Sequence, residues 1–308
     1  MPVGRQAWAG ALMAIFRAAG RSLHYLIRGS GEPLLLIHGL GSSGADWALQ
    51  VRALEQRFRL IVPDLPGCGH SEALVGQCRI EDLAASLWTL LDHLEIPSTN
   101  IVGFSLGGAV ALEMTAQRPD SVPRLALINS LAAYQIDHWR KWLEARLPRL
   151  LIFLFGIRLL GRLCAGRMFP HPWQQAMRER AAAVIGAAPP ASYLAIISAL
   201  ERWSAIDRLD MITSRILIIA AESDHTPLAE KRLLAVQLGA ELVVMRGSRH
   251  GTPFDATEAT NATLLSMFTD EPLPPFDLLS CDEPDLSAVL SFAGSLAEQH
   301  ALGPVEHA

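Results

Sequence analysis

The sequence predicts an α/β protein with a doubly wound, mostly parallel sheet of eight strands and an inserted helical cap. Short, mostly aliphatic runs alternate with helical stretches along most of the chain. Such runs are typical of strands buried on both faces of a parallel sheet. A long stretch that reads as helices alone interrupts this alternation, which indicates an insertion between two core strands.

The elements follow in chain order, beginning with a β-hairpin over residues 13–29 that turns near Ala19-Gly20. Apolar and polar residues alternate on both arms of this hairpin. The expected core strands are Leu34–Ile37, Arg59–Val62, Asn100–Val102, Leu125–Ile128, Ile216–Ala220 and Glu241–Met245. The helices expected between them are Ile80–Leu94, Leu106–Gln117, Leu228–Leu238 and Asp255–Phe268.

Three regions follow from this pattern. Residues 1–130 and 207–270 form the expected core, and residues 131–206 form a helical cap with ten Arg or Lys against four Asp or Glu, a local net charge of 10 − 4 = +6. Residues 271–308 form a C-terminal extension that starts Pro-rich and acidic, which indicates irregular structure, before a stretch that fits an amphipathic helix over 285–302.

Composition excludes several classes of protein. A net charge of −5 gives no signature of nucleic-acid binding, so no nucleic-acid partner is expected. Four cysteines without a CxxC pair argue against a zinc ribbon or a disulfide framework. No apolar run is long enough to cross a membrane, and the N-terminus makes a poor signal peptide because Arg17 directly follows a short apolar stretch. We therefore expect a cytoplasmic protein.

The segment Gly-Phe-Ser-Leu-Gly over residues 103–107 carries the main chemical signal. It lies between an expected strand and an expected helix. A turn this sharp strains the backbone of Ser105 and lifts its hydroxyl out of the sheet, and neighbours without a Cβ avoid a clash there. At a helix N-terminus, backbone N–H groups favour developing negative charge. The pattern predicts a nucleophile; the alternative is a glycine-rich helix start without chemistry.

A serine hydroxyl is a weak nucleophile at neutral pH, so it needs a base, and the base needs an acid to orient it. His250 lies in the loop between the last expected strand and the last helix, and we expect it to be the base. Asp224 follows the strand Ile216–Ala220 and is the expected acid, with Glu222 as the alternative. His225 lies too close to Asp224 in sequence to be its expected partner.

Two backbone N–H groups are expected to form an oxyanion hole. One belongs to Leu106, the residue after the nucleophile, and the other to Leu40 in the glycine-rich loop after an early strand. We interpret His38 as a structural residue that holds this loop, rather than as a base. The residues expected to contact substrate are Gly39, Trp47, Phe104, Phe153 and Trp203.

Five segments together resemble the α/β-hydrolase superfamily, in its serine-nucleophile branch with a helical cap: HGLGSS, VPDLPGCGHS, GFSLGG, AAESDHTPL and GSRHGTP. The resemblance covers about residues 22–268. It implies an eight-stranded sheet with the nucleophile after the fifth strand and the cap after the sixth, and it places the loop 64–71 near the mouth of the site. The chain departs from the family pattern at Ala221 and at Arg249. If Arg249 points at the imidazole, its charge would disfavour the imidazolium, and if it points to solvent, it would have no effect.

A serine at the nucleophile position favours acyl transfer. We expect an enzyme that hydrolyses carboxylic esters of medium or long acyl chains, in the manner of an esterase or lipase, with a small acyl compound as substrate and no metal ion or organic cofactor. The alternatives are a thioesterase or acyltransferase that uses acyl thioesters, a C–C bond hydrolase of the same fold, and a binding protein without catalysis. The sequence does not specify the oligomeric state.

The cap supplies the evidence on substrate and partners. Residues 147–169 are strongly apolar, with Arg149, Arg158, Arg162 and Arg167 interleaved. One interpretation is a helix packed on the core with its arginines in water. The other is an apolar tunnel with arginines at its rim. Such a tunnel would suit fatty acyl groups, and the cationic rim would suit peripheral contact with an anionic membrane.

Overall fold

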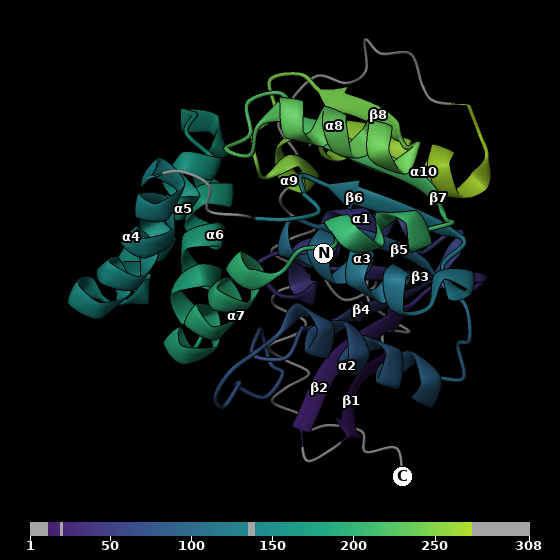
Figure 1. The fold of residues 1–308 in the computed structure, drawn as a ribbon, viewed down its shortest axis with the longest axis horizontal. Helices are drawn as coiled ribbons and strands as arrows, with labels where there is room; N and C mark the ends of the chain where they lie inside the picture. Colours follow the sequence, from purple (N-terminus) through teal and green to yellow (C-terminus); the bar gives the residue numbers. More distant parts are fainter. Residues whose placement is uncertain (1–11, 19–20, 135–138, 273–308) are drawn as a thin grey trace, which may run out of the picture.

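The computed structural model describes residues 12–18, 21–134 and 139–272, which form one eight-stranded sheet covered by helices (Figure 1). The strand order is β1-β2-β4-β3-β5-β6-β7-β8. The pairs β1/β2 and β2/β4 are antiparallel and the remaining pairs are parallel, which confirms the predicted fold class. The strands are β1 (Leu12–Ala18), β2 (Arg21–Arg28), β3 (Glu32–Ile37), β4 (Phe58–Pro63), β5 (Asn100–Phe104), β6 (Arg124–Ile128), β7 (Arg215–Ala221) and β8 (Glu241–Met245).

The helices agree with the predicted alternation, with two differences. Helix α1 and the 3-10 turn before it, Gly44–Trp47, were not anticipated, and the expected helix Asp255–Phe268 is divided at Ala256, whose φ of −133° interrupts the helical backbone. The α-helices are α1 (Ala48–Leu54), α2 (Ile80–His93), α3 (Leu106–Gln117), α4 (Trp139–Phe155), α5 (Ile157–Met168), α6 (Gln175–Ala187), α7 (Pro190–Arg202), α8 (Leu228–Leu238), α9 (Thr252–Asp255) and α10 (Thr257–Thr269).

Alternation along the strands divides the core between the two faces of the sheet. In β3, Leu35 and Ile37 pack in one cluster with residues of α2, α3 and α8, whereas Leu34 and Leu36 pack in the other with residues of α1 and α10. All four side chains are fully buried. Because successive side chains of a strand point to opposite faces, this pattern requires helices on both sides of the sheet.

Helices α4–α7 lie in the chain between β6 and β7 and stand beside the core, at the left of Figure 1. We call them the cap helices. They have a small apolar core of their own, made by Ile157, Leu160, Ile185 and Tyr193. They are also tied to the core, since the Ser192 hydroxyl accepts the N–H of Leu74 at 2.9 Å. The two ends of the insertion meet in a β-bridge between Ala133 and Ser204.

The expected hairpin is present as the β1/β2 pair, with Leu12 opposite Ile27. Its turn at Ala19-Gly20, the N-terminal extension and the tail 273–308, including the helix expected over 285–302, lie outside the described residues. Cys68, Cys78 and Cys164 are free thiols. In the part of the chain that the structure describes, no single helix is long and apolar enough to cross a membrane; α6 and α7 reach that length only as a pair bent by 97°.

Candidate active site

Ser105 occupies the single residue between β5 and α3, in a backbone conformation that side chains rarely adopt. Its φ is 55° and its ψ is −116°. The flanking glycines permit this turn, because a Cβ on Gly103 would lie 2.4 Å from the Gly107 carbonyl oxygen, and one on Gly107 would lie 2.1 Å from the carbonyl oxygen of Ile37. The fold therefore holds the hydroxyl at the carboxyl edge of the sheet through close backbone contacts.

His250 joins Ser105 to Asp224 through both of its ring nitrogens. Nδ1 lies 2.8 Å from Asp224 Oδ1 and Nε2 lies 2.9 Å from Ser105 Oγ. Because a carboxylate only accepts, Nδ1 carries the proton, and Nε2 of the neutral ring is free to accept the serine hydroxyl proton. The structure thus brings together the three residues expected as nucleophile, base and acid. Glu222, the alternative acid, is exposed and accepts the Gly247 N–H at 2.9 Å instead.

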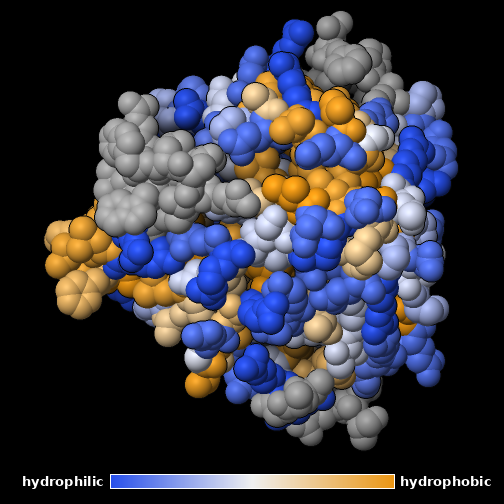
Figure 2. All heavy atoms as spheres, in the orientation of Figure 1, coloured by the Kyte–Doolittle hydropathy of each residue, from blue (hydrophilic) through white to orange (hydrophobic). Residues whose placement is uncertain are grey.

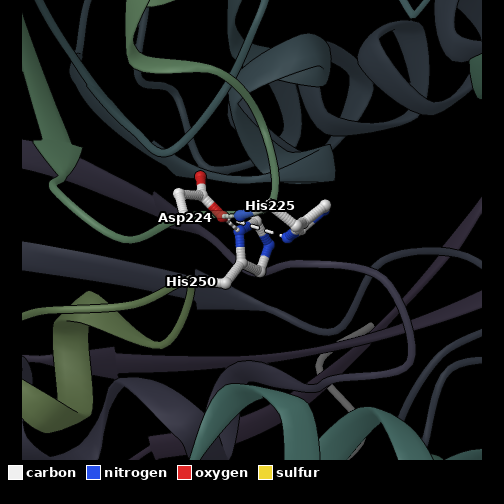
Figure 3. Close-up of side chains that lie close together, drawn as sticks. All are labelled: Asp224, His225 and His250. Carbon is white, nitrogen blue, oxygen red and sulfur yellow. Dashed lines mark hydrogen bonds and ion pairs between the residues drawn. The ribbon is translucent and has the colours of Figure 1, made fainter.

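A second histidine shares the Asp224 carboxylate. His225 Nδ1 lies 3.0 Å from Asp224 Oδ1, and the rings of His225 and His250 lie 4.2 Å apart between centroids. Figure 3 shows the two imidazoles next to the one carboxylate. His225 contacts Asp224 because the loop after β7 turns its ring back onto its neighbour, but the histidine that also reaches Ser105 is His250, as expected for the base.

The other oxygen of Asp224 faces a buried cation that the sequence analysis missed. The ammonium of Lys231 in α8 donates to Asp224 Oδ2, and it also lies 3.1 Å from Asn129 Oδ1. The side chains of Lys231 and Asp224 are both 0% exposed. Lys231 stands between Glu230 and Arg232 in the sequence, and nothing distinguishes it there from its charged neighbours, so only the packing of α8 against β7 reveals this ion pair.

The burial of these groups sets their protonation. Burial by itself raises the pKa of the Asp224 carboxyl, but hydrogen bonds from His225 and His250 and the charge of Lys231 outweigh burial and hold that pKa below its ordinary value. Burial lowers the pKa of His250, and the nearby His225 and Lys231 lower it further, whereas Asp224 opposes the shift. Asp224 is therefore charged and His250 neutral at pH 7, as a general base requires.

The loop after β3 lies where the second oxyanion donor is expected. His38 is buried, lies with Nδ1 2.8 Å from the Gly39 carbonyl oxygen, and accepts the Leu65 N–H at Nε2 at 3.0 Å. It thereby ties the glycine-rich loop to the loop 64–71, in agreement with the structural role expected for it. Leu40 lines the cavity beside Ser105. Leu106 is the first residue of α3, where amides have no acceptor within the helix.

A cavity of about 500 Å³ opens onto Ser105, His250 and Asp224. Gly39 and Phe104 line it, as expected for substrate contacts. Arg249, whose charge was considered above as an influence on the imidazole, also lines the cavity. The charged groups that shift the pKa of His250 are Asp224, His225 and Lys231. The cap contributes mostly apolar side chains to the wall: Cys164, Met168, Phe169, Met177, Ala181, Val184, Ile185, Tyr193 and Leu200.

Three predicted substrate contacts lie elsewhere, and the described lining of the cavity contains none of them. Trp47 is 2% exposed because the 3-10 turn directs it into the core under β3 and β4. Trp203 is 4% exposed and donates its indole N–H to the Glu113 carboxylate at 3.0 Å. Phe153 is 85% exposed on α4. Of these three aromatic residues, two are therefore buried away from the cavity and one faces outward.

Asp224, His225 and His250 also form the group that could hold a metal ion among the described residues, since their ligand atoms lie within 4.8 Å of one another. The sequence analysis expected no metal ion. In the structure these atoms hydrogen-bond to each other. The contacts of the Asp224 carboxylate with the two imidazoles therefore hold the three side chains together.

Comparisons with known proteins agree with this geometry. Residues 32–256 match the family described as alpha/beta hydrolase fold. A candidate carbamate hydrolase, RutD, of Caulobacter vibrioides is 29% identical over 256 residues, covering 79% of this chain and 94% of that protein. The magnesium-chelatase 30 kDa subunit of Rhodobacter capsulatus is 39% identical, but the match spans 35% of this chain and only 37% of that relative.

Among solved structures, the enol-lactonase of Burkholderia xenovorans superposes with a TM-score of 0.76 at 26% sequence identity. The alignment covers 83% of this chain and 99% of that one. The alignment therefore includes most of this chain and almost the whole of that enzyme.

Proposed function

The chain belongs to the alpha/beta hydrolase fold family, and from this premise we propose that it is a serine hydrolase that cleaves carboxylic esters through an acyl-enzyme intermediate. The observation that carries the proposal is the hydrogen-bonded series Asp224–His250–Ser105 at 2.8 and 2.9 Å. Two similar proteins are named as a carbamate hydrolase and an enol-lactonase. Hydrolysis of a carbamate or a lactone also proceeds by attack on an acyl carbon.

In the proposed reaction, His250 Nε2 takes the proton of the Ser105 hydroxyl while Oγ attacks the ester carbonyl carbon. The N–H groups of Leu40 and Leu106 stabilise the oxyanion of the tetrahedral intermediate. The imidazolium then donates its proton to the leaving alcohol, which departs and leaves the acyl group on Oγ. Water, deprotonated by His250, attacks that acyl group and releases the acid and free Ser105. Asp224 holds the ring and stabilises its charge throughout.

The apolar cavity wall favours a substrate whose acyl group is apolar and binds against the cap helices. Met168, Met177, Val184 and Ile185 offer flexible and aliphatic surface, and a volume of about 500 Å³ lies in the range of small-ligand sites. Methionine adapts to chains of different length. We therefore propose medium acyl chains as the preferred substrates.

The test combines covalent labelling with a substrate panel. A fluorophosphonate probe should label the protein, and peptide mapping should place the label on Ser105. Hydrolysis of p-nitrophenyl esters, measured from acetate to laurate, should peak at an intermediate chain length. Parallel assays with acyl-CoA donors, with and without an acceptor alcohol, separate an esterase from a thioesterase or acyltransferase.

The matched control uses a second serine of the same cavity. Ser223 lines the cavity and is exposed, whereas Ser105 bonds to His250. Ser105→Ala should abolish both labelling and hydrolysis, and Ser223→Ala should keep both. Labelling that survives in Ser105→Ala, or folded protein that neither labels nor hydrolyses any ester or thioester, would refute the proposal.

A further inference from the structure

The tip where α4 meets α5 carries a concentration of exposed apolar side chains. Phe153 is 85%, Leu154 55% and Phe155 63% exposed, in one run that ends at Gly156. Figure 2 shows orange atoms that project at the left edge of the molecule, where Figure 1 places the cap helices. Leu147, Leu150 and Leu163 add exposed surface on the same two helices. Contiguous apolar surface of this kind marks an interaction site.

Cationic side chains lie directly beside this tip. Arg158 and Arg162 follow on α5, one helical turn apart, and with Arg178 of α6 they line a groove of about 610 Å³. Within the described residues, no ion pair joins any of these three arginines to a carboxylate. The one acid in the groove wall is Glu179, which accepts a hydrogen bond from Gln175 at 2.8 Å. The groove therefore keeps a surplus of positive charge.

We propose that the α4–α5 tip is a docking surface for an anionic lipid bilayer. Phe153 and Phe155 enter the interface, and Arg158, Arg162 and Arg178 contact phosphate groups at headgroup level. Aromatic and aliphatic side chains next to arginines are the combination with which peripheral proteins bind such surfaces.

Charge decides between a bilayer and a second copy of this chain. A symmetric contact through the tip would bring the same patch of two molecules together. The arginines beside the apolar residues would then face each other without a partner carboxylate, which repels. An anionic bilayer supplies the negative charge that the arginines lack, so the two kinds of side chain on the tip favour the same occupant.

The docking surface is linked to the cavity through α5. The helix presents Arg158 and Arg162 to the outer groove, while Cys164, Arg167 and Met168 line the cavity over Ser105. The same helix therefore contributes to both the docking surface, through its first turns, and the cavity wall, through its last turn. The docking itself does not depend on ester hydrolysis, so its failure would leave the proposed function standing.

The experiment measures partitioning of the whole protein onto vesicles by co-sedimentation. The vesicles contain phosphatidylcholine alone, or phosphatidylcholine with phosphatidylglycerol. Arg158→Gln/Arg162→Gln should weaken binding to the anionic vesicles about 25-fold, since each basic residue near such a surface contributes about fivefold. Phe153→Ser/Phe155→Ser should weaken binding to both vesicle types at least about tenfold.

Matched controls come from α8, which carries exposed residues of the same types. Leu233 and Val236 are 59% and 79% exposed there, and Arg232 is exposed beside them. Leu233→Ser/Val236→Ser and Arg232→Gln should leave partitioning unchanged. All variants should hydrolyse a soluble p-nitrophenyl ester at the wild-type rate, which establishes that they fold.

Two results would overturn the proposal. One is wild-type protein that stays in the supernatant with anionic vesicles, or that partitions no better than the tip variants. The other is a dimer in sedimentation-velocity runs that Phe153→Ser/Phe155→Ser converts to monomer, without vesicle binding by either form; that outcome would assign the tip to a second copy of the chain.

Discussion

Replacing Asp224 by asparagine tests how the acid is held, because each carboxylate oxygen receives fixed donors. Oδ1 accepts the His225 backbone N–H at 2.6 Å and the His250 Nδ1–H at 2.8 Å, and Oδ2 accepts the Lys231 ammonium and the Thr226 hydroxyl. An amide offers one oxygen and one NH₂ group. If its oxygen faces Lys231, the NH₂ faces His250 and imposes the wrong tautomer on the base; if it faces His250, the NH₂ meets the ammonium.

The magnitude follows from this conflict. Loss of the acid in a Ser-His-Asp triad through a change to asparagine lowers kcat by about 10⁴, or about 5 kcal/mol. In Asp224→Asn/Lys231→Met, the amide can turn its oxygen toward His250 while its NH₂ donates to the Thr226 hydroxyl oxygen. A hydrogen bond from a charged donor is worth about 1.5–3 kcal/mol, so the double variant should recover about 10- to 150-fold of the lost rate.

The assay is kcat on a soluble p-nitrophenyl ester for the wild type, both single variants and the double variant, with thermal unfolding measured in parallel. Lys231→Met alone serves as the control, because it leaves the buried carboxylate without its cation, which costs about 3–5 kcal/mol of stability. If the double variant is as slow as Asp224→Asn while folding normally, Lys231 does not set the orientation of the amide and the reasoning is wrong.

Two further predictions concern pH and packing. Because the pKa of His250 is lowered, its base form persists below pH 6.5, so the acidic limb of kcat/KM against pH should lie below that of a free histidine; a midpoint above pH 6.5 would contradict this. Gly107→Ala should abolish soluble expression, because its Cβ would lie 2.1 Å from the Ile37 carbonyl oxygen, whereas Gly166→Ala, with no atom within 4 Å, should express normally.

Much of the fold was predictable because burial on both faces leaves a plain signal. The six core strands and the helices α2, α3 and α8 lie within two residues of their predicted bounds. The helix α1 was missed because it is short, with only the seven residues Ala48–Leu54, and it follows a glycine-rich loop and a 3-10 turn over Gly44–Trp47. The break at Ala256 was missed because nothing in the sequence marks the non-helical backbone of this alanine.

The site was predictable only where a local pattern fixes the chemistry. Ser105, Asp224 and His250 each follow a strand at the carboxyl edge of a parallel sheet, so their meeting follows from topology. The substrate contacts lacked such a constraint. Trp203 and Phe153 lie on cap segments whose inward faces the sequence does not specify, and packing placed one in the core and the other in solvent.

Asn129 shows why the acid and the base meet so closely. It follows β6 with a φ of 49°, and its side-chain oxygen accepts the Ala221 N–H at 2.7 Å and faces the Lys231 ammonium. Its amide NH₂ donates to the His250 carbonyl oxygen at 3.0 Å and to the Thr252 hydroxyl at 2.7 Å. One buried amide thus connects the end of β7, the helix that neutralises Asp224 and the loop that carries His250. Because both its oxygen and its NH₂ are used, an aspartate here would lose the donors that hold the His250 loop, and a leucine would lose every one of these bonds. The side chain of Asn129 therefore aligns the acid with the base through the His250 backbone and the Lys231 ammonium.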